Sequence, residues 1–172
     1  MSEVFVNKVS ESGILSIDLE LYYPKQTIKI FDLKEYLFMG LILKEKDFRA
    51  ALLNTDWSVY ENCIVGITCS ADAIIPMWAY MLVASYLQPV AAYVSIGTEQ
   101  KIIELIIEKN IAEQIDENEF VDKRVVIKGC GDKETDEQAF VAITRKLAPV
   151  ARAIMFGEAC SSVPVFKKTL ET

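Results

Sequence analysis

The feature that most constrains the fold is a pattern of helix and strand that occurs twice in the second half of the chain. The segment from Ala79 to Gly97 aligns without a gap to the segment from Ala139 to Gly157, at an offset of 60 residues. In each copy a helix leads into an apolar strand that ends at a glycine. We interpret the pattern as a duplicated strand–helix–strand unit with copies at 61–97 and 122–157.

Short apolar runs predict the core strands, at 64–68, 90–96, 124–128 and 150–156. Helices are expected between them, at 76–87, 101–109 and 136–147. Earlier in the chain, strands are expected at 14–21 and 27–31, followed by a mostly helical segment at 33–53. Alternating strands and helices indicate parallel strands joined by right-handed crossovers. We predict one α/β domain over residues 1–172, with three α/β/α layers, a mainly parallel sheet and the N-terminal strands at its edge.

The composition excludes several classes of function. The chain has no histidine, so an imidazole base and a histidine-containing metal site are excluded. The net charge is −7, without a cluster of basic and aromatic residues, which argues against nucleic-acid binding. The longest apolar run, Ala73 to Leu87, is shorter than the roughly 20 residues of a membrane span. No signal peptide is recognised at the N-terminus, so a cytoplasmic protein is expected.

Three of the four cysteines lie a few residues past the end of a predicted core strand. These are Cys69, Cys130 and Cys160, and a one-residue gap in the repeat aligns the first with the second. The carboxyl ends of parallel strands meet at one edge of a sheet, where helix N-termini favour the thiolate. We expect the three sulfurs to converge there if their strands are neighbours. Cys63 opens a strand instead and is expected to be a small buried hydrophobic residue.

Three converging thiolates are typical of a site for a soft metal: zinc, copper(I) or an iron–sulfur cluster. The fourth ligand is expected to be water or one of the carboxylates Asp72, Asp132 and Glu158. A second interpretation of Asp72 and Asp132 is that they stabilise the starts of helices. The sequence contains no CxxC pair, so neither a thioredoxin-type motif nor a zinc ribbon is indicated.

Four blocks of the sequence resemble a known family. They are Leu41–Arg49, Thr68–Met81, Arg124–Cys130 and Met155–Pro164. Together they are similar to the Bacteroidetes family of domain of unknown function 2480, and the resemblance covers nearly the whole chain. It implies a small cytoplasmic protein of unassigned function that is associated with iron–sulfur assembly proteins. It supplies no catalytic residue.

Three functions therefore stay open at this point. The first is an accessory protein that binds a metal ion or an iron–sulfur species through the three strand-end cysteines. The second is a cysteine-dependent enzyme, such as a thiol transferase or a metal-assisted hydratase, and the third is a non-catalytic scaffold with structural cysteines. A homodimer is also expected, because the helix at 76–87 is apolar on nearly every face and must be buried on more than one side.

Overall fold

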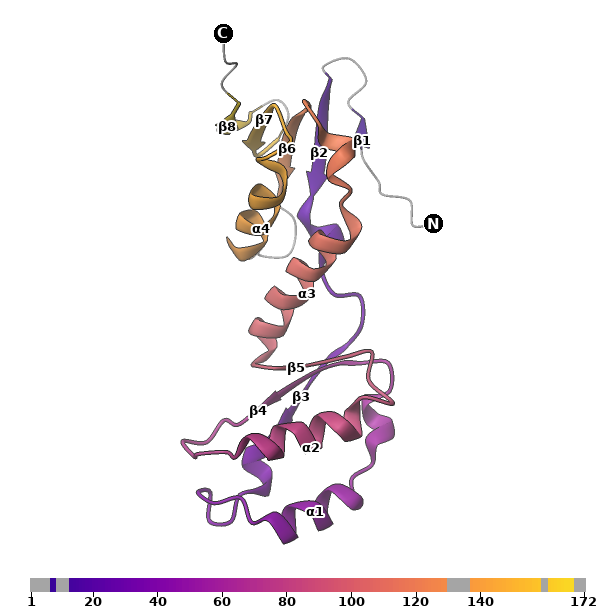
Figure 1. Cartoon of the computed structure of the whole chain (residues 1–172), viewed down its shortest axis with the longest axis vertical. Helices are drawn as coiled ribbons and strands as arrows, with labels where there is room; N and C mark the ends of the chain where they lie inside the picture. Colours follow the sequence, from indigo (N-terminus) through magenta and orange to yellow (C-terminus); the bar gives the residue numbers. More distant parts are fainter. Residues whose placement is uncertain (1–6, 9–12, 130–136, 159–160, 169–172) are drawn as a thin grey trace. The chain divides into compact units, whose positions relative to one another are not determined.

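The structure is a computed structural model that describes residues 7–8, 13–129, 137–158 and 161–168 (Figure 1). The chain divides into two compact units. We call Pro24–Ile103 the continuous unit, and Met1–Tyr23 together with Glu104–Thr172 the split unit. No helix among these described residues is long and apolar enough to cross a membrane.

The continuous unit is built on a parallel sheet of three strands in the order β3-β4-β5. Its elements are β3 (Ile28–Asp32), the 3-10 helix η2 (Leu33–Tyr36), α1 (Glu45–Leu53), the 3-10 helix η3 (Trp57–Tyr60), β4 (Ile64–Thr68), α2 (Met77–Leu87) and β5 (Tyr93–Ile96). The central strand β4 is apolar and buried, as expected for a strand covered on both faces.

The core of the continuous unit is rich in aromatic side chains. Phe31 of β3 stacks on Tyr36 and on Trp57, with ring centroids 5.2 and 5.6 Å apart, and Trp57 stacks in turn on Tyr86 of α2 at 5.0 Å. Stacked rings of this size bury large apolar areas. They join β3, η3 and α2 into one hydrophobic core, which also includes residues of α1.

The split unit has a sheet of five strands in the order β1-β2-β6-β7-β8. Its inner strands β2, β6 and β7 are parallel, and β1 and β8 flank them antiparallel. Its elements are β1 (Asn7–Lys8), β2 (Ile14–Asp18), the 3-10 helix η1 (Leu19–Tyr22), α3 (Glu99–Gln114), whose first residues belong to the continuous unit, the 3-10 helix η4 (Glu117–Phe120), β6 (Arg124–Lys128), α4 (Glu137–Leu147), β7 (Ala153–Phe156) and β8 (Val163–Lys167).

The internal structures of the two units match at a constant offset of 60 residues from β4 to β5 and from β6 to β7. Asn62 and Asp122 both have a left-handed backbone with φ of 56°. Their N–H groups donate to the carbonyls of Val90 and Val150 at 3.0 and 2.9 Å. A non-glycine residue rarely adopts this backbone, so its presence at both positions means that one turn geometry is used twice.

Each unit also has a strand from the N-terminal part of the chain that pairs directly with the repeat, β3 with β4 and β2 with β6. We call β2 and β3 the first strands of the two units, and they end in the same way. Asp18 ends β2 and accepts the N–H of Glu20, while Asp32 ends β3 and accepts the N–H of Lys34, both at 3.0 Å. An aspartate that accepts the N–H two residues on starts a turn, here the 3-10 helix that follows.

Side-chain sizes differ where each first strand meets its neighbour. In the continuous unit Ile30 of β3 lies opposite Gly66 of β4. In the split unit Ser16 of β2 lies opposite Val126 of β6. The larger side chain therefore lies on the first strand in the continuous unit and on the strand of the repeat in the split unit.

The predicted α/β class and mainly parallel strands are confirmed. The four core strands are parallel as expected, but they do not share one sheet: β4 and β5 belong to one sheet, β6 and β7 to another. The sequence interpretation placed both N-terminal strands at the edge of one sheet, but β2 and β3 belong to different sheets. Of the N-terminal strands, β1 and β3 lie at edges, while β2 lies one place inside.

Several local predictions also needed correction. The strand expected at 14–21 ends at Asp18, and Leu19–Tyr22 form the 3-10 helix η1. The strands expected from 90 and 150 begin at Tyr93 and Ala153, because residues 88–90 and 148–150 form turns. The segment 33–53 is helical only at its two ends, and Phe38 and Ile42 form an antiparallel bridge between them. The strand β8 was not predicted.

Candidate functional site

The predicted metal site begins at the carboxyl end of β4, where Cys69 follows directly. Cys69 is half-buried, and its thiol donates to the carbonyl of Ala71 at 3.6 Å. The next residue, Ser70, donates its backbone N–H to the carboxylate of Asp32 at 3.0 Å. This contact joins the ends of β3 and β4 beside the cysteine.

Two side chains near this strand end have shifted pKa values. Burial raises the pKa of Asp32, but hydrogen bonds from Ser70 and from the backbone of Lys34 outweigh it, so the pKa of this carboxyl lies below its usual value. The pKa of Tyr80 on α2 is raised, mainly by burial and also by an electrostatic interaction with the nearby Cys69. The surroundings of Cys69 therefore contain an ionised carboxylate and a neutral phenol.

The other two predicted ligands follow β6 and β7, which are parallel neighbours, with Ile127 opposite Phe156. Cys130 and Cys160 themselves lie outside the described residues, as does Asp132. Of the remaining carboxylate candidates, Asp72 is exposed, and Glu158 forms an ion pair with Lys128 at the end of β6. This pair links the segments that lead to Cys130 and Cys160.

The three strands that precede the cysteines were expected to be neighbours in one sheet, and this is true of two of them. The strands before Cys130 and Cys160 adjoin, but the strand before Cys69 lies in the other sheet. The described residues contain no group of three or more Cys, Asp or Glu side chains that could hold a metal ion. Whether the three sulfurs meet therefore stays a prediction. Cys63, expected to be buried, is buried, and its thiol donates to the carbonyl of Glu61 at 3.5 Å.

The alignment of the two cysteines in the repeat also changes. The sequence interpretation paired Ile64 with Val125, one residue further than the offset of 60. Strand register pairs Ile64 with Tyr93 and Arg124 with Ala153, so the offset stays at 60 through both strands. The position that corresponds to Cys69 is then Gly129. Its lack of a side chain fits the ring of Phe140, which would lie 2.3 Å from an added Cβ.

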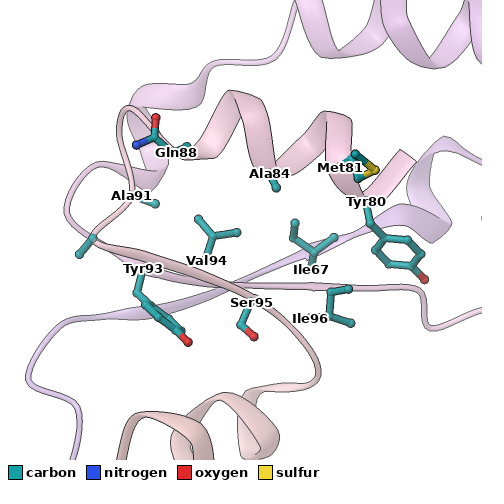
Figure 2. Close-up of a pocket in the computed structure, with 11 residues that line it drawn as sticks. Ile67, Tyr80, Met81, Ala84, Gln88, Ala91, Tyr93, Val94, Ser95 and Ile96 are labelled. Carbon is teal, nitrogen blue, oxygen red and sulfur yellow. The ribbon is translucent and has the colours of Figure 1, made fainter. Parts of the chain in front are cut away.

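A second site is a groove of about 710 Å³ in the continuous unit, which we call the β5 groove. Figure 2 shows Tyr80, Met81 and Ala84 of α2, with Gln88 just after its end, along one side and the segment from Ala91 to Ile96 along the other, with Ile67 between them. The described residues that line it are uncharged. The sequence indicated only that Tyr80 and Met81 belong to a strongly apolar helix.

Comparison with known proteins places the chain in one family. Residues 3–168 match the family model described as "Protein of unknown function (DUF2480)". Neither the curated proteins nor the solved structures gave a significant match. Because the family model covers nearly all of the 172 residues, the chain belongs to the DUF2480 family of proteins of unknown function.

Proposed function

We propose that this protein binds a soft transition metal, as zinc or within an iron–sulfur species, through thiolates at the carboxyl ends of β6 and β7. The observation that carries the proposal is the parallel pairing of these two strands, with Ile127 opposite Phe156. Cys130 and Cys160 follow this pair closely in the sequence. Both are therefore central ligands of the proposed site.

The spacing of the strands suits such a site. Neighbouring strands lie roughly 4.8 Å apart, and two sulfurs on one zinc ion lie about 3.7 Å apart at bonds of about 2.3 Å. The ion pair of Lys128 with Glu158 supports the proposal, because it joins the ends of the two strands that precede Cys130 and Cys160 in the sequence. Glu158 is already paired with Lys128, and Asp132 stays a further carboxylate candidate.

Cys69 and Asp72, which follow β4 in the continuous unit, stay a prediction as a third thiolate and a further carboxylate ligand. Cys69 is half-buried and its thiol contacts only a carbonyl at 3.6 Å, a weak hydrogen bond that a metal could replace. The proposal also includes a cytoplasmic location, where thiols stay reduced, and iron–sulfur assembly proteins as partners.

The test is metal analysis and an absorption spectrum of the full chain after anaerobic purification. We expect zinc, or iron with sulfide, at a fixed ratio to protein. Cys130→Ser and Cys160→Ser should each remove the metal, whereas Cys63→Ser should retain it. Cys69→Ser decides whether the site has a third thiolate. Metal-free wild-type protein, or metal that persists in Cys130→Ser and Cys160→Ser, would contradict the proposal.

The second candidate function is a non-catalytic scaffold whose cysteines are structural. Two observations favour it: Cys63 is buried, and the Cys69 thiol is directed at a backbone carbonyl. Alkylation of the folded, metal-free protein separates the candidates. A scaffold predicts that all four thiols react slowly, and a metal site predicts rapid reaction at Cys130 and Cys160 that bound metal suppresses. Rapid alkylation of one thiol that added metal does not slow would instead favour a cysteine-dependent enzyme.

A further inference from the structure

The strand β5 lies at the edge of its sheet, whereas its counterpart β7 lies inside one. In the split unit β8 covers β7, with Phe166 opposite Ile154. In the continuous unit, no described strand follows β5 in the sheet order. The β5 groove runs along this edge, beneath α2 (Figure 2).

Burial differs between the two units at matching positions. Ile154 and Ala151 are both 0% exposed, whereas Val94 and Ala91, at the corresponding positions, are only half-buried. In both units the matching strand, β5 or β7, is parallel to its inner neighbour, and the matching helix, α2 or α4, precedes it in the chain. The difference therefore indicates that the β5 edge has room for the extended strand that β8 supplies in the split unit.

The chemistry of this edge also fits a strand partner. Exposed edge strands usually carry a charged residue, a proline or a bulge that prevents pairing. The segment from Ala91 to Gly97 contains no charged residue and no proline. Ile96 is 59% exposed, and Met81 on the adjacent face of α2 is 72% exposed. An edge with these properties pairs readily with an extended apolar strand.

We propose that β5 of a second copy of this chain occupies the edge, antiparallel and related by a two-fold axis. Side chains alternate along β5, so Val94 and Ile96 face the same side, and Ala92 directly precedes the strand. A two-fold axis through Val94 places the small Ala92 of one copy opposite the large Ile96 of the other. The strand is thus complementary to itself, and its lack of charge avoids repulsion between copies. Two-fold pairing also closes the assembly at a dimer.

The test is sedimentation velocity of the full chain over the micromolar range, with the cysteines kept reduced so that disulfides cannot join copies. The wild type should be a dimer. Ile96→Lys and Met81→Lys should each raise the dimer dissociation constant by about 30-fold or more, because each would bury an unpaired charge at the interface. The matched control is Leu53→Lys on α1, which is 74% exposed in the same unit and does not line the groove.

Three outcomes are decisive. A dimer that both groove variants weaken and Leu53→Lys leaves intact supports the proposal. A wild-type chain that is monomeric throughout overturns it, and the groove would then take an extended segment of another protein. A dimer that resists both groove variants overturns it as well, because another surface must hold the copies together. Met81→Lys keeps the test valid if Ile96→Lys fails to fold.

Discussion

We predict that Gly66→Ala destabilises the continuous unit. The backbone of Gly66 is not left-handed, so alanine alone would stabilise by about 0.4–1 kcal/mol through the unfolded state. The added Cβ, however, would lie 2.8 Å from the carbonyl oxygen of Gly97 and 2.9 Å from side-chain carbons of Ile102 and Ile30. Overpacking of a core costs about 1–3 kcal/mol. Because one of the three contacts is backbone and cannot rotate away, we expect a net loss of about 2 kcal/mol.

Urea denaturation followed by tryptophan fluorescence measures this loss. Both tryptophans, Trp57 and Trp78, lie in the continuous unit, so their signal follows the unit that carries the change. With a denaturant slope of about 2 kcal/mol/M, the midpoint should fall by about 1 M. Adding Ile30→Val removes one of the three contacts and should recover part of the loss. A midpoint equal to or above that of the wild type would refute the packing argument.

Three further predictions concern other buried or paired groups. The hydroxyl of Ser16 is buried without a hydrogen-bond partner among the described residues, so Ser16→Ala should raise the free energy of unfolding by about 1 kcal/mol, measured by circular dichroism in urea; a loss would contradict this. The low pKa of Asp32 adds stability at neutral pH that disappears as the pH falls through that pKa, so the destabilisation caused by Asp32→Asn should shrink in acid, and a pH-independent difference would count against it. Cys63 is buried, so mass spectrometry after alkylation should find it modified only in urea; rapid labelling of the folded chain would show that it is accessible.

Individual elements could be predicted well from the sequence where their pattern was unambiguous. The apolar runs at 64–68 and 124–128 coincide with β4 and β6. A short apolar run between turns is typical of a buried strand. The boundaries at 90 and 150 were less accurate, since Val90 and Val150 are apolar but belong to turns after the helices. Apolar character marks burial and does not by itself distinguish a strand from a tight turn.

The division into two sheets could not be read from the apolar pattern, because sequence order does not determine which strands adjoin. One indication was present. Asp18 and Asp32 each end a short strand, and the leucine that follows each of them begins a 3-10 helix. Two strands that end alike near the N-terminus are more consistent with one first strand for each repeat than with a shared edge.

The candidate sites could also be predicted only in part, because they depend on which strands adjoin. Convergence of the cysteines was conditional on neighbouring strands. The strands before Cys130 and Cys160 are neighbours, but the strand before Cys69 lies in the other sheet. The β5 groove was not predictable from the sequence. It lies beside β5, where no described strand takes the place that β8 has in the split unit. The strand β8 was itself hidden by Pro164, which a strand tolerates at the edge of a sheet.

The exchange of side-chain sizes between the units has a consequence for folding. The strands β2 and β3 are close in sequence and end alike, so during folding each could dock against β4 or β6. Ile30 opposite Val126 would overpack the sheet, and Ser16 opposite Gly66 would leave a void, so both wrong pairings are penalised. A duplicated chain risks mispairing its halves. Here two residue pairs make each first strand specific for its own sheet.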